Sequence, residues 1–332
     1  MNGHRVIVTG GSGFIGSYVT RALWQEGYEV GVIDIAEPGP EARFVLGDAF
    51  DDTRFFRTGV DDAAGVFEAT KVFAPRSFVH LAAVVDPGAL KTDPRLATRI
   101  NLGGTINVLE AARQIDAERV VFLSSIAVLP TIQYEPIDGS HPVILATEGP
   151  GGGFYGSAKV ASEAFCFAYE QGFGLDIRII RPSAVYGFGM QLPIYVKPMV
   201  EGAVRGEDVV FETGGSFPRD YTHAEDVASL TVSVLEAPVS ADRVFYGATG
   251  QPLVTASEIA DVVRTLIPEA SITIGAELTP SDQTNMKYRG VLSIENARTQ
   301  LGWEPQFSDI HDGIEHYVKR YRQFLNSQTS TH

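Results

Sequence analysis

The glycine-rich stretch TGGSGFIG, at Thr9 to Gly16, constrains the fold of this chain more than any other part of its sequence. A short apolar run at Arg5 to Val8 precedes it, and apolar residues recur at helical spacing after it. The pattern predicts a strand, a tight turn and a helix. Because glycine loses the most conformational freedom on folding, four glycines in eight positions are costly unless a ligand must approach the backbone.

The spacing of Gly11, Gly13 and Gly16 fits a dinucleotide-binding fingerprint, in which the pyrophosphate lies at the positive end of the helix. Taken alone, the same glycines could also form an ordinary strand-to-helix loop. The next predicted strand, EVGVID, ends in Asp34, where an acid that binds the adenosine ribose is expected. Its carboxylate would repel a 2′-phosphate, and no arginine follows directly. We therefore expect NAD to be preferred over NADP.

Predicted strands alternate with predicted helices over the first part of the chain. After Asp34 the sequence has an apolar run at 43–46, strands at 77–83, 119–125 and 175–182, and helices at 93–114 and 155–171. This order predicts an α/β fold, a Rossmann-type doubly wound parallel sheet over residues 1–185 with a returning segment at about 220–250. Residues 186–325 do not continue this alternation of strands and helices and are expected to form mainly a smaller α/β substrate-binding cap. The tail at 326–332 is expected to be disordered.

Composition narrows the classes of function. The chain has 332 residues and a formal net charge of −15, which argues against general affinity for nucleic acid or anionic membranes. No apolar run approaches the ~18 residues that span a bilayer, and residues 1–10 lack the apolar stretch of a secretory signal. The single cysteine, Cys166, suits a reducing compartment, so we expect a cytoplasmic protein with Cys166 in its core. No cluster of candidate ligands has metal-binding spacing, and no metal is expected.

Two segments bring hydroxyl groups and a lysine to the predicted carboxyl edge of the sheet. The strand at 119–125 ends in Ser124 and Ser125, and the later sequence FYGSAK places Tyr155 and Lys159 one helical turn apart. A Tyr and a Lys at this spacing are common on helix surfaces. Beside a dinucleotide, however, the ammonium group would lower the pKa of Tyr155 and make it a general base. Ser125 would bind the same substrate oxygen, and Lys159 could hold the nicotinamide ribose.

These motifs, taken together, resemble those of the extended short-chain dehydrogenase/reductases, and among them the NAD-dependent epimerase/dehydratase family typified by UDP-sugar 4-epimerases. The resemblance runs from about Arg5 to Pro305 and includes HLAA at 80–83, NLGGTINVLEAA at 101–112, RPSAVYG at 181–187, RDYTHAEDVA at 219–228 and LGWEP at 301–305. It implies a catalytic triad of Ser125, Tyr155 and Lys159. It also implies a homodimer paired through the helices at 93–114 and 155–171.

The resemblance implies further binding residues. The cofactor-binding residues are expected to be Gly10, Gly13, Phe14, Ile15, Gly16, Asp34, Asp48, Ala49, Leu81, Ala82, Ala83, Asn101, Tyr155, Lys159 and Pro182. Ser124, Ser125 and Arg219 are expected to bind the substrate, with Arg219 on the pyrophosphate of a nucleotide-sugar. A surface ion pair would explain Arg219 equally well. We expect structural roles for three other polar residues: His80 in the core, His223 bracing the turn of Arg219, and Asp226 capping the helix after it.

Three departures from the family pattern leave the reaction open. Ala184 stands where nucleotide-sugar enzymes often carry an asparagine, the run GPGGGF at 149–154 could be flexible and reshape the sugar pocket, and Ile126 makes a dehydratase less favoured. The first interpretation is a UDP-sugar 4-epimerase. The second is an NAD-dependent dehydrogenase of a free sugar, sugar acid or other secondary alcohol. The third is a dinucleotide-sensing regulator without catalysis, against which the intact triad argues.

Overall fold

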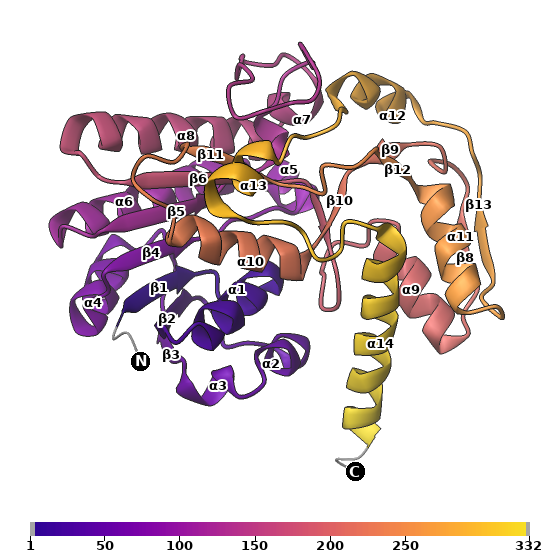
Figure 1. Ribbon diagram of the computed structural model, residues 1–332, viewed down its shortest axis with the longest axis horizontal. Helices are drawn as coiled ribbons and strands as arrows, with labels where there is room; N and C mark the ends of the chain where they lie inside the picture. Colours follow the sequence, from indigo (N-terminus) through magenta and orange to yellow (C-terminus); the bar gives the residue numbers. More distant parts are fainter. Residues whose placement is uncertain (1–3, 330–332) are drawn as a thin grey trace.

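A seven-stranded parallel sheet forms the larger part of the computed structural model, which describes residues 4–329 (Figure 1). Its strand order is β11-β6-β5-β4-β1-β2-β3. The strands are β1 (Arg5–Thr9), β2 (Glu29–Asp34), β3 (Arg54–Arg57), β4 (Ser77–His80), β5 (Arg119–Leu123), β6 (Ile177–Pro182) and β11 (Val244–Gly247). The predicted doubly wound Rossmann sheet is confirmed.

Helices cover both faces of this sheet because its strands are apolar on both sides. In β1, Val6 and Val8 pack into one core and Ile7 into the other, as alternating side chains of a strand must. The first face carries α1 (Phe14–Gln25) and α10 (Ala224–Leu235). The second carries α4 (Ala63–Phe73), α6 (Gly104–Gln114) and α8 (Phe154–Phe173). Short helices α2 (Pro40–Leu46), α3 (Ala49–Asp52), α5 (Pro87–Thr92) and α7 (Gly149–Gly152) lie in the connections.

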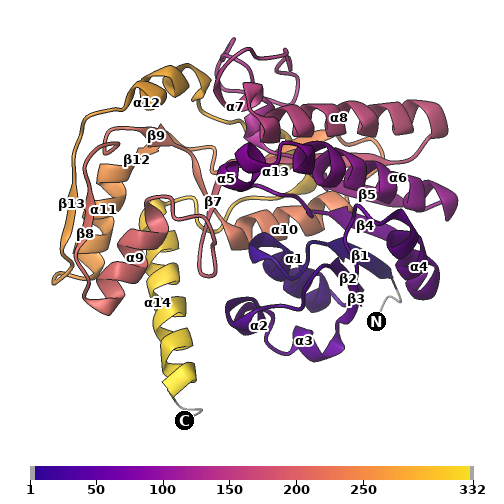
Figure 2. The same cartoon turned by 180° about the vertical axis from the view of Figure 1, so that it is seen from behind.

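A smaller group of elements lies beside the sheet, seen from both sides in Figures 1 and 2. It contains three two-stranded pairings, β10 with β7, β12 with β9 and β13 with β8. Its strands are β7 (Ala184–Tyr186), β8 (Val209–Phe211), β9 (Pro218–Arg219), β10 (Tyr221–His223), β12 (Val254–Thr255) and β13 (Ile272–Ile274). Its helices are α9 (Val196–Arg205), α11 (Ala256–Leu266), α12 (Pro280–Asn285) and α14 (Ile310–Thr329), whereas α13 (Glu295–Leu301) packs on α10 and β11 of the sheet domain.

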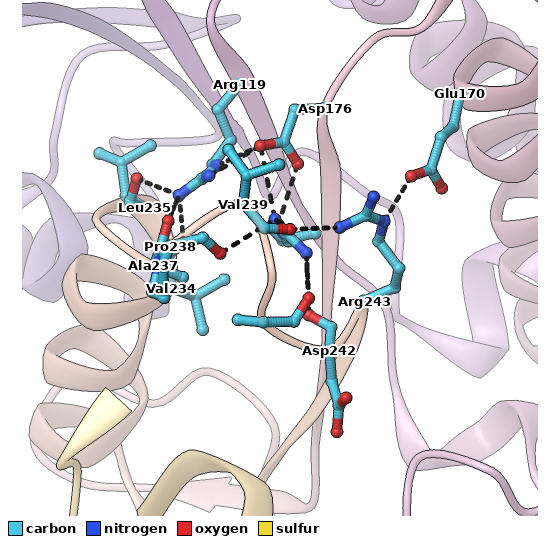
Figure 3. Close-up of polar contacts among 12 residues, drawn as sticks. Arg119, Glu170, Asp176, Val234, Leu235, Ala237, Pro238, Val239, Asp242 and Arg243 are labelled. Carbon is cyan, nitrogen blue, oxygen red and sulfur yellow. Dashed lines mark hydrogen bonds and ion pairs between the residues drawn. The ribbon is translucent and has the colours of Figure 1, made fainter. Parts of the chain in front are cut away.

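Two buried arginines join the amino edge of the sheet to the end of α10 and the segment that follows it, through hydrogen bonds (Figure 3). The Arg119 and Arg178 side chains, 9% and 0% exposed, both pair with Asp176. Arg119 donates to the carbonyl oxygens of Val234, Leu235 and Ala237, and Arg178 donates to those of Pro238, Val239, Ala241 and Asp242. The carbonyl groups at the end of a helix lack partners within it, so these cations satisfy them.

The apolar run at 43–46 belongs to helix α2, which begins at Pro40. Two predictions about local structure are wrong. The helix expected at 93–114 is interrupted, because residues Ala97–Gly103 form π-helical turns before α6. Residues 326–329 are helical rather than disordered, because α14 buries Tyr317 and Tyr321 and packs Phe324 against Phe188. The rest of that tail, 330–332, and the first part of segment 1–10 lie outside the described residues.

Between residues 4 and 329, the structure contains no helix with the length and apolar character needed to cross a bilayer.

Candidate active site

The glycine-rich turn brings three segments into close contact at the carboxyl edge of the sheet. Gly10 has φ of +75°, and a methyl group there would lie 2.9 Å from the Cα atom of Ala82. A methyl group on Gly16 would lie 2.0 Å from the carbonyl oxygen of Gly10. Gly13 caps α1 without any side-chain hydrogen bond, so the amides at Phe14 and Ile15 begin the helix unoccupied by a capping side chain. This arrangement suits a pyrophosphate at the start of α1.

Asp34 ends β2 beside this turn. Its carboxylate accepts hydrogen bonds from the backbone amides of Ser12 (3.1 Å) and Ile35 (2.7 Å). Burial raises the pKa of Asp34, and the amide donors oppose the rise. The buried hydroxyl group of Ser12 has no partner among the described residues. Arg57 lies opposite Asp34 in the register of β3, a neighbour that the sequence did not reveal.

The other predicted cofactor residues fall into two groups. Leu81, Ala82 and Ala83 follow β4, and the amides of Leu81 and Ala82 donate to Thr9, which keeps this segment beside the glycine-rich turn. Pro182 is buried at the end of β6. Asp48 is exposed, and Ala49 is buried at the start of α3, with no contact that joins either to the turn. Their place at the adenine stays a prediction.

Asn101 links the segment after β4 to helix α8 through hydrogen bonds. Its side-chain oxygen accepts from the amide of Val84 at 2.7 Å, and its side-chain nitrogen donates to the carbonyl oxygen of the same residue at 2.9 Å. Its own carbonyl oxygen accepts from the Ser162 hydroxyl group on α8. These contacts support the active-site helix, and the cofactor contact expected for this side chain stays a prediction.

The structure brings Ser125, Tyr155 and Lys159 together. Ser125 follows β5, and Tyr155 and Lys159 lie in the first turns of α8. The Lys159 ammonium nitrogen lies 5.8 Å from the Tyr155 ring centre, 4.6 Å from the Phe122 ring centre and 2.6 Å from the carbonyl oxygen of Leu123, to which it donates. Ser124 is buried, and its hydroxyl group has no partner among the described residues.

The expected lowering of the Tyr155 pKa is wrong for the protein without its cofactor. Burial raises the pKa of Tyr155 to about 12, and a side-chain hydrogen bond with Ser125 opposes the rise. Burial also lowers the pKa of Lys159 to about 8. The ammonium group is held at the Leu123 carbonyl rather than at the phenol oxygen, so desolvation dominates the titration of Tyr155.

The glycine run before Tyr155 is packed at its start and exposed at Gly152 and Gly153. Residues Gly149–Gly152 form helix α7. A methyl group on Gly149 would lie 2.3 Å from the ring of Tyr288, and one on Gly156 would lie 2.2 Å from the carbonyl oxygen of Pro150. Gly149 and Gly156 thus permit close contact between segments, whereas the expected flexibility of the run stays a prediction.

Two arginines without an acidic partner face a small cavity next to the triad. The guanidinium carbons of Arg219 and Arg289 lie 4.8 Å and 5.2 Å from the ring centre of Phe217. Neither Nε atom has a hydrogen-bond partner, and neither side chain forms an ion pair within residues 4–329. Burial, with Arg219 next, lowers the pKa of Arg289 to about 10. The surface ion pair considered for Arg219 is wrong.

The cavity has a volume of about 20 Å³ and is mostly apolar. Its walls are formed by Ile126, Leu129, Ile137, Ala184, Arg219, Asp220, Leu253, Tyr288, Arg289, Gly290 and Leu292. Asp220 does not pair with Arg219, because its carboxylate accepts from the hydroxyl groups of Ser183, Thr222 and Thr249. The sequence did not single out Arg289, since it lies in an irregular segment that no motif marks.

The remaining polar residues have structural roles. His80 lies between the hydroxyl groups of Thr9 (2.6 Å) and Thr105 (3.0 Å), which confirms its place in the core. His223 caps α10 by accepting from the Glu225 amide, whereas Asp226 accepts from the amides of Gln306 and Phe307. The predicted capping role of Asp226 is therefore wrong. Cys166 is buried, as expected, and burial raises the pKa of its thiol.

One exposed group at the start of α14 has side-chain ligand atoms within 4.8 Å of one another: His311, Asp312 and Glu315. No motif in the sequence marks this trio. Exposed acidic side chains on one helix turn commonly lie this close, and no second feature marks the group as a metal site. The expectation of no metal stays a prediction.

The sequence matches the NAD dependent epimerase/dehydratase family over residues 6–245. The chain belongs to this family. Its members are NAD-dependent, so the protein is an enzyme that uses NAD, and the glycine-rich turn, Asp34 and the start of α1 are the residues that fit this cofactor. The alternative of a regulator without catalysis is not retained.

Similar proteins within the epimerase/dehydratase family differ in reaction. A putative UDP-glucose 4-epimerase of Methanocaldococcus jannaschii is 27% identical, covering 94% of this chain and 97% of the relative. UDP-glucuronic acid decarboxylase 1 of Arabidopsis thaliana is also 27% identical, covering 96% of this chain and 70% of the relative. The crystal structure of Thermus thermophilus UDP-glucose 4-epimerase with NAD has a TM-score of 0.79 and 29% identity, covering 96% of this chain and 99% of that one.

Proposed function

We propose that the protein interconverts a UDP-sugar and its 4-epimer. The observation that carries this proposal is the pair of guanidinium groups, Arg219 and Arg289, which both lie close to the Phe217 ring and form no ion pair among the described residues. Two adjacent cations that repel each other are costly without an anion between them, and a guanidinium group binds phosphate oxygens with two hydrogen bonds. A diphosphate supplies that anion. The UDP-glucose 4-epimerases among the relatives support uridine as its nucleoside.

The cavity links this anion site to the triad. Ile126, which directly follows Ser125, lines the same cavity as Arg219 and Arg289. A sugar diphosphate bound there would place its sugar toward Ser125 and Tyr155. Because the cavity holds little more than a water molecule, the segments that carry Tyr288 and Arg289 must move outward to admit the substrate.

The chain's own residues account for the proton transfer. Ser125 would hold the 4-hydroxyl oxygen of the sugar, and Tyr155 would take its proton as general base. When bound, NAD would supply reversible hydride acceptance, and Tyr155 would return the proton to the oxygen when the hydroxyl group re-forms. The largely apolar wall of Ile126, Leu129 and Leu292 offers few hydrogen bonds to the sugar, so the keto sugar can turn between the two transfers.

The proposal is tested by thermal-shift titration of the NAD-loaded protein with UDP. A ligand that binds only the folded state raises its stability, so UDP should raise the Tm of the unmodified protein. Arg219→Met and Arg289→Met should each lose most of that increase. Arg264→Met is the matched control, since Arg264 pairs with Asp261 on the surface of α11. An unchanged response in both test variants would refute the anion site.

One observation favours a second candidate function. Ala184 lines the cavity where an asparagine amide would bind a phosphate, and its methyl group offers no hydrogen bond. An NAD-dependent dehydrogenase of a free sugar, sugar acid or other secondary alcohol would need no such contact. The two functions differ in net redox change. An epimerase converts a UDP-sugar without accumulating NADH, whereas a dehydrogenase forms one NADH for each substrate molecule oxidised.

We further propose a cytoplasmic homodimer that pairs through α6 and α8. Three phenylalanines of α8 are more exposed than large apolar side chains of a monomer usually are: Phe165 (41%), Phe167 (41%) and Phe173 (60%). Burying them against a second copy would remove apolar surface from water. The single buried cysteine, Cys166, suits a reducing compartment such as the cytoplasm.

A further inference from the structure

A buried ion pair lies one helical turn beyond the active-site lysine. Glu163 follows Lys159 by four residues on α8, so the two side chains share a face of the helix. The Nε and Nη2 atoms of Arg181, on β6, donate to the two carboxylate oxygens of Glu163 at 3.0 Å and 2.7 Å. The side chains of Arg181 and Glu163 are only 3% and 4% exposed. Arg181 also donates to the hydroxyl group of Tyr246 at 3.2 Å.

Such a pair is not explained by stability alone. Moving two charges out of water costs several kcal/mol per ion, and well-packed apolar residues often serve the fold as well or better. A buried carboxylate also acts on charges near it, because the low dielectric of the interior screens little. The charged group on which the Glu163 carboxylate can act here is the ammonium group of Lys159, and Lys159 is itself only 3% exposed.

Few other groups stabilise the buried positive charge of Lys159. Its ammonium group has one protein hydrogen bond, to the carbonyl oxygen of Leu123, and lies near the Phe122 ring. The titratable groups around it are Tyr155, Glu163 and Cys166 on α8, His80 on β4 and, behind Glu163, Arg181 on β6. Burial keeps Tyr155, Cys166 and His80 neutral near pH 7, because it raises the pKa of the first two and lowers that of His80 to about 3. Glu163 is therefore the anionic group of this set.

We propose that Glu163 is a positioning residue that acts through Lys159: its carboxylate, held in place by Arg181, keeps the buried ammonium group of Lys159 charged at neutral pH. Arg181 fixes the carboxylate through two hydrogen bonds. The inference rests on the proposed role of Lys159 in the triad. It adds that the charge of this lysine is set from the core side of α8, away from the cofactor and substrate.

The titration of Lys159 tests the proposal directly and needs no substrate. Lysines labelled with ¹³C at Cε give few signals, and the one lost in Lys159→Arg belongs to Lys159. In Glu163→Gln the titration midpoint of Lys159 should fall by about one pH unit, since loss of a nearby opposite charge favours the neutral amine. Glu163→Asp keeps the charge and should restore most of the shift. Glu170→Gln, which removes another carboxylate of α8 paired with Arg243, should leave the midpoint unchanged.

A double variant guards against misfolding of Glu163→Gln. Glu163→Met combined with Arg181→Met replaces the ion pair by apolar side chains, a change that proteins often tolerate. Its Lys159 midpoint should also fall, because Glu163 is among the charges that act on Lys159 and Arg181 is not. A midpoint that stays at the unmodified value in the single or the double variant would overturn the proposal. So would an equal fall in Glu163→Asp and Glu163→Gln, which would indicate a purely structural role.

Kinetics provide a second readout that separates this inference from the proposed function. If Lys159 must be charged, the alkaline limit of kcat should move to lower pH in Glu163→Gln and stay in place in Glu170→Gln. Failure of the whole UDP-sugar panel with the unmodified protein would refute the proposed function and leave the Lys159 titration as evidence on Glu163. Loss of activity at every pH without a shifted Lys159 midpoint would refute the inference.

Discussion

The Lys159 ammonium group donates to the Leu123 carbonyl oxygen while lying 5.8 Å from the ring of Tyr155. The partly buried active-site phenol thus has no hydrogen bond to its lysine, and desolvation raises the pKa of Tyr155 to about 12. A positively charged nicotinamide ring close to the phenol would stabilise the phenolate. We therefore expect bound NAD to lower the Tyr155 pKa. The check is the phenolate absorbance of the unmodified protein minus that of Tyr155→Phe, titrated with and without NAD; coinciding curves would contradict it.

Tyr155→Phe should abolish most turnover and leave NAD binding intact. The substitution removes the ionisable oxygen and keeps the ring, so turnover should fall by roughly the 10²–10⁴ typical of general acid-base catalysis. NAD affinity, measured by calorimetry, should change little. Tyr169→Phe on the same helix removes a hydroxyl group that contacts Glu110 and is the control. Turnover of Tyr155→Phe within a few fold of the control would exclude Tyr155 as the base.

Asp34→Ala should narrow the preference for NAD over NADP. The carboxylate that would meet the ribose hydroxyl groups and repel a 2′-phosphate is lost, whereas Arg57 remains on the neighbouring strand. Dissociation constants for both dinucleotides provide the measurement. Glu29→Ala changes an exposed acid at the other end of β2 and should leave both constants unchanged. Equal affinities for NAD and NADP in the unmodified protein would contradict the role of Asp34.

Gly16→Ala should destabilise the protein and weaken NAD binding. Its new methyl group would meet the carbonyl oxygen of Gly10 at 2.0 Å, so the turn must move, at a cost of about 1–3 kcal/mol typical of overpacking. Gly172→Ala on α8 meets no atom within 4 Å and should stabilise the protein by about 0.4–1 kcal/mol. The measurement is the Tm of each variant in thermal unfolding. A Tm for Gly16→Ala at or above that of Gly172→Ala would be the opposite result.

Phe167→Asp should shift the proposed dimer toward monomer. A charge at a position buried between two copies of α8 would lack a partner and would be costly to desolvate. Sedimentation velocity at micromolar concentration measures the change. Val210→Asp, at a 66% exposed position of β8 in the cap, should leave the assembly as it is. A monomer in the unmodified protein would remove the basis of this proposal.

Sequence patterns predicted the sheet better than the site around it. The glycine-rich turn, the strand ends at Asp34 and Ser125 and the Tyr155–Lys159 spacing are local features, so each lies where expected. Arg289 and Asp226 were missed or misjudged because their partners lie far away in the sequence, at Phe217 and at Gln306 and Phe307. The pKa of Tyr155 was misjudged for a related reason, since burial depends on packing that no local pattern encodes.

The guanidinium groups of Arg119 and Arg178 also bear on how the chain can be divided. They lie on β5 and β6, but the carbonyl oxygens that satisfy them belong to residues 234–242, and β11 completes the sheet only afterwards. A fragment that stopped near residue 185 would leave these two guanidinium groups with Asp176 as a partner but without their carbonyl acceptors, and one edge of β6 without its neighbour. Such a fragment should aggregate rather than fold. The nucleotide-binding domain of this enzyme should therefore fold stably only after the cap segments and β11 have been synthesised.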